Sequence, residues 1–166
     1  MVRGPHKPCL RTGVQNGSAV RDFLTLLVSK KVDLVLQRHD HTYRRTRPIA
    51  SGHASCDVVL PEGYNPDCVA NESADTYVKG QGSVFVIAGT AGETETAIDL
   101  NNPIAPYFVS TMGTNGAGAH GFMRVVVSRT QLNAAFVTTA GNAFSDAFAI
   151  SGPLQSPARM DPRPPR

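Results

Sequence analysis

Apolar side chains at helical spacing mark the first regular element of the chain. Four of them follow the i, i+3, i+4, i+7 pattern: Val20, Phe23, Leu24 and Leu27. This pattern predicts an amphipathic α-helix with these side chains on its buried face. Residues 32–36 then form a short, nearly continuous apolar run, which is typical of a strand covered on both faces. Helix and strand together predict half of a β–α–β unit.

The other apolar runs are short and predict strands. Residues 83–88 form one such run, which a glycine-containing turn ends. Later in the chain, three runs separated by brief polar turns predict consecutive antiparallel strands: 122–128, 132–139 and 144–150. The polar segments 37–79 and 89–120 are expected to be long loops.

Composition favours a mixed α/β (α+β) fold in a single domain. The 166 residues include 15 glycines and 12 prolines, which favour turns between short strands over a helical bundle. Residues 1–152 are expected to form the folded part. The proline- and arginine-rich residues 153–166 are expected to be a disordered tail.

Charge and hydropathy exclude two classes of partner. The formal charge is only +3, and the arginine clusters have neither the length nor the interleaved aromatics of a nucleic-acid surface. No apolar stretch approaches the roughly 20 residues that span a bilayer, so we expect no membrane partner. Residues 1–6 have no apolar core of a signal peptide, and the localisation and the oligomeric state stay open.

Three cysteines leave two alternatives open. The spacing of Cys9, Cys56 and Cys68 matches no zinc-knuckle pattern. Cys56 and Cys68 bracket a loop and form a disulfide if the compartment is oxidising. Reduced, buried thiols are the other interpretation.

Histidines follow the ends of predicted strands. His39 and His41 come just after the run 32–36, where the carboxyl ends of parallel strands open into a crevice. In an extended segment, residues i and i+2 project to the same side, so both imidazoles can face one cavity. His6 precedes the helix and is expected at the end of the preceding strand. Three imidazoles at one sheet edge suit iron, zinc or manganese.

The segments around these histidines resemble calcineurin-like metallophosphoesterases, and most of all their purple acid phosphatase branch. The likeness rests on His6-Lys7-Pro8, on residues 32–46 with His39-Asp40-His41-Thr42-Tyr43, and on residues 82–92 and 120–150. It implies the C-terminal part of a four-layer metallophosphoesterase β-sandwich that is flanked by helices and ends in an antiparallel meander.

The resemblance also implies a function. His6 and His39 would bind one metal ion and His41 the other, with iron beside zinc, manganese or a second iron. The substrate would be a phosphate ester, and the reaction would be hydrolysis. The family's Asp and Asn ligands belong to upstream motifs that are not in this sequence, so the chain is expected to be an incomplete C-terminal part.

Two positions depart from the family pattern. Arg38 replaces a glycine, so its bulk and charge should disfavour a cation and favour a phosphate. Arg44 stands where the branch commonly has an acidic residue. Between the histidines, Asp40 either orients an imidazole or is solvated. We expect His53 to be solvated and His120 to make a structural hydrogen bond.

Three hypotheses about function remain. The first is a phosphoester hydrolase of which this chain is a part. The second is an inactive remnant, or a module that binds a metal ion weakly or an anion at Arg38 and Arg44. The third is a non-catalytic, β-rich accessory domain with coincidental histidines.

Overall fold

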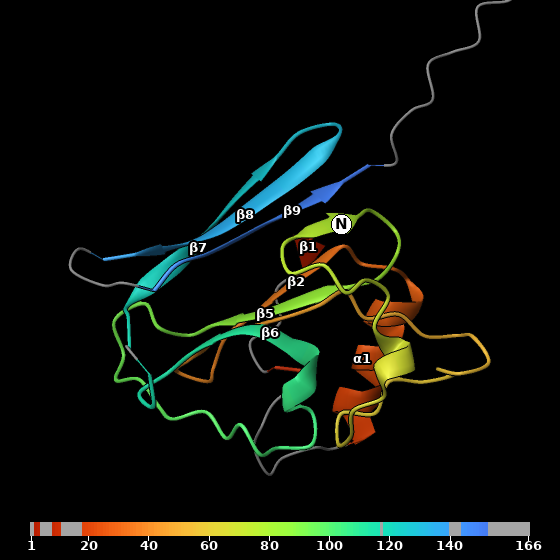
Figure 1. Ribbon diagram of the computed structural model, residues 1–166, viewed down its shortest axis with the longest axis horizontal. Coiled ribbons are helices and arrows are strands. Elements are labelled where there is room, and N and C mark those ends of the chain that lie inside the picture. Colours follow the sequence, from red (N-terminus) through yellow and green to blue (C-terminus); the bar gives the residue numbers. More distant parts are fainter. Residues whose placement is uncertain (1, 4–7, 11–17, 117, 140–143, 153–166) are drawn as a thin grey trace, which may run out of the picture.

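Two β-sheets lie face to face, and one helix packs against the outer side of the first sheet (Figure 1). The computed structural model describes residues 2–3, 8–10, 18–116, 118–139 and 144–152. The described residues thus form three of the four layers that the resemblance implies. The predicted tail, residues 153–166, lies outside them.

The first sheet has five strands in the order β1-β2-β5-β3-β6. Their bounds are Val2–Arg3 (β1), Leu34–Gln37 (β2), Tyr43–Thr46 (β3), Val84–Ala88 (β5) and Phe108–Met112 (β6). Strands β1, β2 and β5 are parallel, whereas β3 is antiparallel to β5 and β6. The predicted half of a β–α–β unit, α1 followed by β2, is confirmed, and β1, β2 and β5 end at the same edge of the sheet.

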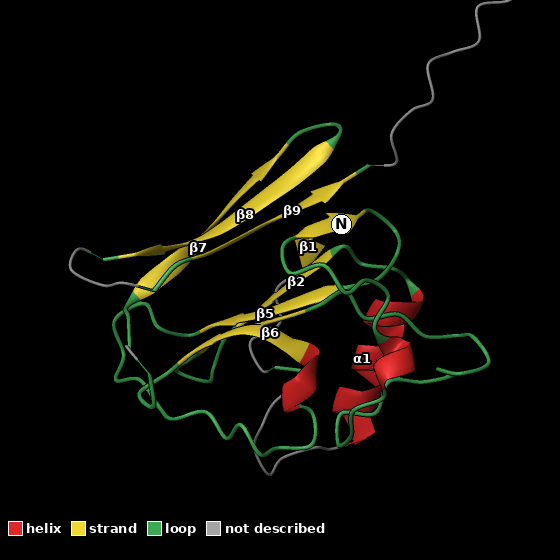
Figure 2. Ribbon diagram, viewed as in Figure 1, coloured by secondary structure: helices red, strands yellow, loops and turns green. Residues whose placement is uncertain are grey.

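The second sheet contains the predicted meander. Its four strands have the order β4-β9-β8-β7. Their bounds are Thr76–Val78 (β4), Gly121–Val127 (β7), Gln131–Thr138 (β8) and Asp146–Ser151 (β9). Strands β7, β8 and β9 pair antiparallel in succession, which confirms the prediction (Figure 2).

The α-helix of the described part of the chain, α1 (Ser18–Ser29), buries a slightly different face from the predicted one. Leu24, Leu27 and Val28 are buried, whereas Phe23 is 39% exposed, so the prediction for Phe23 was wrong. The reason is geometric: residues i, i+3 and i+4 centred on Leu24 face the sheet, and this turns position 23 toward solvent. Lys31, at φ 48°, ends the helix, with the amide of Val32 donating to the carbonyl of Leu27.

Three strands lie in segments that were predicted to be loops. Strand β3 is the clearest correction, because its sequence is Tyr-Arg-Arg-Thr and yet all four residues are buried. Hydrophobic patterning could not identify it, because its burial depends on partners for the two arginines. Strands β4 and β6 were missed because each lies alone between long polar segments.

Two hydrophobic cores lie on opposite faces of the first sheet. On the side of α1, Val35 and Phe85 pack with Leu24 and the loop residue Ile49. Between the sheets, Leu34 and Val86 pack with side chains of the second sheet. Strand β2 is therefore covered on both faces, as its continuous apolar sequence predicted. Among the described residues, no helix is long and apolar enough to cross a membrane.

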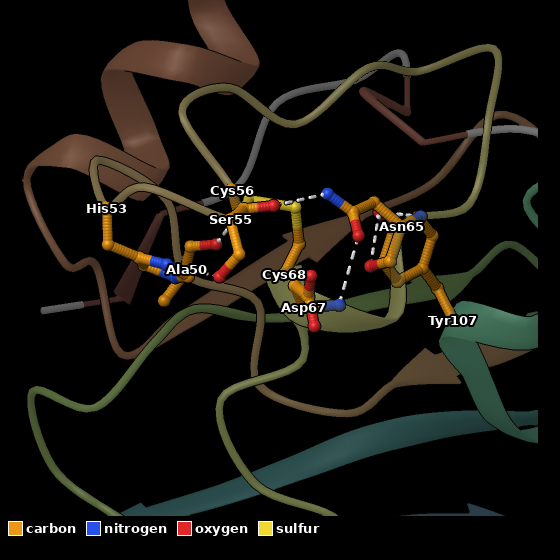
Figure 3. Close-up of a disulfide and its surroundings, with 8 residues drawn as sticks. All are labelled: Ala50, His53, Ser55, Cys56, Asn65, Asp67, Cys68 and Tyr107. Atoms are coloured by element: carbon orange, nitrogen blue, oxygen red, sulfur yellow. Dashed lines mark hydrogen bonds between the residues drawn. A yellow bond between two sulfur atoms is a disulfide. The ribbon is translucent and has the colours of Figure 1, made fainter.

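A disulfide between Cys56 and Cys68 closes the long loop after β3 (Figure 3). The structure thus decides between the two alternatives for these cysteines, and Cys9 is a buried free thiol. Both half-cystines are buried in the core beside α1. Next to the disulfide, Asn65 donates from its side chain to the carbonyl of Ser55 over 2.9 Å. The loop also contains a short 3-10 helix (Pro66–Cys68), and a second one (Ala105–Tyr107) precedes β6.

Candidate metal-binding site

A pocket opens at the edge of the first sheet where β2 and β5 end. Its volume is about 270 Å³, and the residues that line it include Arg38, His39, His41, Gly89 and Glu93. We call it the histidine pocket. Two of the predicted metal ligands, His39 and His41, therefore line one pocket. The segment that carries them is bent and not extended, so the i, i+2 geometry on which the prediction relied is not the reason.

A hydrogen bond fixes the orientation of the His41 ring. Its Nδ1 lies 2.9 Å from the carbonyl oxygen of Thr94. Because a carbonyl can only accept, Nδ1 is the donor, and in the neutral ring the lone pair is then on Nε2. The backbone of His41 is held as well, since its carbonyl accepts from the amide of Thr96 over 3.0 Å. This is the arrangement in which a histidine is ready to bind a metal ion through Nε2.

His39 has an unusual backbone conformation. Its φ is 81°, in the left-handed region that favours glycine. Such conformations cost free energy and cluster at functional sites. The residue with the left-handed backbone is His39 and not Arg38, so the arginine that replaces the family's glycine causes no backbone strain at position 38.

Gly89 allows the loop of the two histidines to approach β5. A Cβ atom on Gly89 would lie 2.0 Å from the carbonyl oxygen of Asp40, far inside van der Waals contact. The amide of Gly89 also donates to the carbonyl of Thr42 over 3.1 Å. Only glycine fits here, and its close approach fixes where His39 and His41 lie relative to the pocket.

Asp40 forms an ion pair with Arg44. The Nη2 atom of Arg44 donates to Oδ2 of Asp40 over 2.6 Å, and its Nε donates to the hydroxyl of Thr42 over 3.0 Å. Arg44 is only 3% exposed. Asp40 is therefore not the solvated carboxylate that was one of its alternatives. Arg44 is too deeply buried to serve as the surface anion site of the second hypothesis.

Tyr43 and Arg45 point between the two sheets, where both bind Asp146. Arg45 donates from Nε and Nη2 to the two carboxylate oxygens of Asp146, over 2.6 and 2.8 Å. Tyr43 donates its hydroxyl to Oδ2 of the same carboxylate over 2.5 Å. Arg45 also donates to the hydroxyl of Tyr77. We call these four residues the Asp146 network.

The protonation of this network follows from its burial. Burial, and then the negative charge of Asp146, raise the pKa of Tyr43 well above its ordinary value. Burial alone would lower the pKa of Arg45, but the hydrogen bonds and charge of Asp146 outweigh it and raise that pKa. Tyr43 and Arg45 belong to the family-like motif, yet here they join β3 to the second sheet. Sequence reasoning missed Asp146, because nothing in the sequence connects residues about 100 positions apart.

The third predicted ligand, His6, lies outside the described residues. Its convergence with His39 and His41 stays a prediction. The parallel pairing of β1 with β2 means that both strands end at the edge where the histidine pocket opens. Within the described residues, no group of three or more His, Cys, Asp or Glu side chains is placed to hold a metal ion. Two imidazoles at one pocket fit part of a metal's ligand shell.

His53, His120 and the free thiol of Cys9 do not line the histidine pocket. His53 is exposed and lies 3.3 Å from the hydroxyl of Ser55. His120 makes the expected structural hydrogen bond, with Nδ1 3.2 Å from the carbonyl of Thr90. Burial raises the pKa of the Cys9 thiol to about 11. Cys9 is therefore protonated near neutral pH and is not an activated nucleophile.

Comparisons with known proteins identify the fold. No protein-family model matches this chain, and no curated protein matches it. Among solved structures, it is similar to a purple acid phosphatase isolated from yellow lupin (Lupinus luteus) seeds, with 19% sequence identity and a TM-score of 0.66. The match covers 91% of this chain and 24% of the lupin chain, so this chain spans about a quarter of that protein's length. The mixed α/β fold of this chain thus resembles the C-terminal part of a purple acid phosphatase.

Proposed function

We propose that this chain forms the histidine-bearing part of a two-metal phosphoester hydrolase site. The observation that carries the proposal is the shared pocket of His39 and His41, in which the ring of His41 is oriented by the Thr94 carbonyl. The fold likeness to a purple acid phosphatase supports the same reaction class. In this proposal His39 and His41, together with His6, are the metal ligands.

The donor set suits the metals that the family resemblance implies. Neutral imidazole nitrogens bind iron, zinc and manganese, and the proposed pair is iron with zinc, manganese or a second iron. Bound metal ions supply Lewis-acid chemistry, by polarising phosphoryl oxygens and lowering the pKa of water. Arg38 is exposed and lines the pocket, so its guanidinium is proposed to contact the phosphate of the substrate.

The described residues do not supply the bridging carboxylate that a two-metal site needs. Asp40, the carboxylate nearest in sequence to the histidines, is paired with Arg44. Without an anionic ligand between them, two cations repel each other and the second binds weakly. We therefore expect this chain by itself to hydrolyse phosphate monoesters poorly or not at all.

The alternative is a module that binds a metal ion or an anion without catalysis. Arg38 favours it, because a permanent positive charge beside His39 opposes a cation and attracts a phosphate. If the charge opposes the metal, replacing Arg38 by glycine should increase metal affinity. Because the backbone at position 38 has an ordinary φ, the gain would come from charge and bulk alone.

Calorimetric titration of the 166-residue chain with Zn²⁺ and Mn²⁺ tests the proposal. The double variant His39→Ala, His41→Ala should lose binding, whereas His53→Ala, an exposed histidine outside the pocket, should not. Turnover of p-nitrophenyl phosphate is measured on the same samples. Equal metal affinity in all three proteins would overturn the proposed ligands. Robust turnover that disappears in the double variant would overturn the expectation of weak activity and would show that the chain completes its own site.

A further inference from the structure

The ring of His41 takes its orientation from an exposed loop. This loop, residues 90–96, follows β5, and its residues 91–94 are all exposed. The carbonyl of Thr94 accepts from Nδ1 of His41 over 2.9 Å. Because no buried side chain holds residues 91–94, the position of this carbonyl depends on how the two ends of the loop are anchored.

Backbone hydrogen bonds anchor the second end of the loop. The amide of Thr96 donates to the carbonyl of His41 over 3.0 Å, and the carbonyl of Thr96 accepts from the amide of Thr114 over 3.1 Å. Between the two ends, Gly92 has a φ of 116°, which L side chains rarely adopt. The chain can therefore turn sharply here, and the first end needs an anchor of its own.

His120 contacts both ends of the loop. Its Nδ1 lies 3.2 Å from the carbonyl oxygen of Thr90, which also accepts from the amide of Gly121 over 3.1 Å. The same Nδ1 lies 3.8 Å from Oε1 of Glu95. Within the described residues, the buried hydroxyl of Thr90 has no hydrogen-bond partner, so Thr90 is anchored through its carbonyl.

Glu95 belongs to the peptide group that orients His41. The carbonyl of Thr94 and the amide nitrogen of Glu95 share one planar peptide unit, so fixing Glu95 also fixes the direction of that carbonyl. The side chain of Glu95 is only 10% exposed. A Cβ atom on Gly118 would collide with its carboxylate, which therefore lies directly against the backbone there. The negative charge also favours a proton on the nearby Nδ1 of His120.

We propose that His120 and Glu95 are positioning residues for His41. Neither lines the histidine pocket, and both act through the Thr94 carbonyl. By closing the loop, they keep this carbonyl on Nδ1 of His41, which leaves the lone pair of the neutral ring on Nε2. The proposal rests on the proposed function, because the orientation of His41 matters to a ligand only if Nε2 binds a metal ion.

The first test reads the tautomer of His41 without any metal ion. Long-range ¹H–¹⁵N NMR spectra of the imidazole nitrogens are recorded at about pH 8, where an ordinary imidazole is neutral. The unaltered chain should show His41 with its proton on Nδ1. His120→Phe and Glu95→Gln should show both tautomers. His120→Asn should keep the first, because its side-chain amide can still donate to Thr90. The control His53→Phe removes an exposed histidine outside the loop and should change nothing.

The second test measures Zn²⁺ binding to the same proteins by calorimetric titration. His120→Phe should weaken binding by about 10- to 100-fold and His120→Asn should restore it, since removing the group that orients a ligating histidine has this effect. A role in stability alone would lower the unfolding temperature and leave the tautomer of folded His41 unchanged. Far-UV circular dichroism shows whether each protein folds. Glu95→Gln keeps the size of its side chain and serves as the test if His120→Phe does not fold.

The outcomes separate this proposal from the metal site. A single Nδ1–H tautomer of His41 in every variant would overturn the positioning role, whatever the Zn²⁺ affinities are. A changed tautomer with unchanged Zn²⁺ affinity would show that binding does not need this orientation, and would overturn it as well. A changed tautomer in a set of proteins that all fail to bind Zn²⁺, the unaltered chain included, would keep the positioning role and overturn the proposed ligands.

Discussion

Two halves of one short segment have opposite environments. His39, Asp40 and His41 lie at the open edge of the first sheet, where both histidines face a pocket. Tyr43 and Arg45 follow within four residues and are buried between the sheets, with exposed fractions of 0% and 2%. The boundary is the point where the chain enters β3. The same run of polar residues thus divides into a part available for chemistry and a part that holds the molecule together.

The difference shows that a polar motif is not uniformly functional. On β3, side chains alternate between the faces of the sheet, so Tyr43 and Arg45 both point toward Asp146. Arg44 points the other way and lies over the ring of Phe108. Variants in the Asp146 network should therefore change stability, whereas variants at the histidine pocket should change metal binding.

The largest expected effect is at Asp146. Asp146→Ala leaves the buried guanidinium of Arg45 without its ion-pair partner, which should lower the free energy of unfolding by about 3–5 kcal/mol. Urea denaturation measures this loss. Asp57→Ala, which removes an exposed carboxylate, is the control and should change stability by no more than about 0.5 kcal/mol. A loss below about 1 kcal/mol for Asp146→Ala would mean that the network contributes little to the joining of the sheets.

Gly89→Ala should affect both the stability of the fold and the histidine pocket. The added methyl group must displace the carbonyl of Asp40, at a cost of about 1–3 kcal/mol in unfolding free energy, and should move both histidines. Denaturation and Zn²⁺ titration measure the two effects. Gly63→Ala is the control, because a Cβ there meets nothing within 4 Å. Unchanged Zn²⁺ affinity in Gly89→Ala would contradict the proposed role of this close approach.

Tyr43→Phe tests the network through pH. Removing the hydroxyl should cost about 1–1.5 kcal/mol at neutral pH. In the unaltered chain, the raised pKa of Tyr43 means that unfolded Tyr43 ionises near pH 10 while folded Tyr43 does not. Tyr43 should therefore contribute a fall in the free energy of unfolding above about pH 10, in addition to the fall that begins near pH 9 because burial also raises the pKa of Cys9.

In Tyr43→Phe, the free energy of unfolding should fall less steeply above about pH 10 than it does in the unaltered chain. The decline should not vanish, because burial raises the pKa of Tyr77 and Tyr107 as well. Chemical denaturation at several pH values gives the two slopes. Identical slopes for the two proteins would contradict the assigned environment of Tyr43.

The smallest expected effect is a gain in stability. His39→Gly relieves the left-handed conformation and should raise the free energy of unfolding by about 0.5–1 kcal/mol, while Zn²⁺ binding is lost. Lys31→Gly is the matched control, since Lys31 also has a positive φ and ends α1. It should gain stability and leave metal binding unchanged. Loss of stability in His39→Gly would show that the side chain has a structural role.

Periodicity and strand-end rules determined much of this protein from its sequence. The helix over residues 18–29, the buried strand before the histidines and the three-stranded meander all follow from apolar spacing. The place of His39 and His41 at the end of that strand also follows from the sequence, whereas the extended i, i+2 geometry does not hold, because the segment bends and His39 has a φ of 81°. Each of these features is local, because backbone geometry alone fixes which neighbouring side chains share a face.

Tertiary structure alone decided the features that depend on distant partners. Strand β3 is buried although it is polar, because Asp146 arrives from the other end of the chain to neutralise Arg45. The disulfide was an open alternative until the loop brought Cys56 to Cys68. Glu93 comes to line the same pocket as the histidines after the turn at Gly92. Burying a charge is costly unless a partner offsets it, and a sequence pattern does not reveal which distant residue will be that partner.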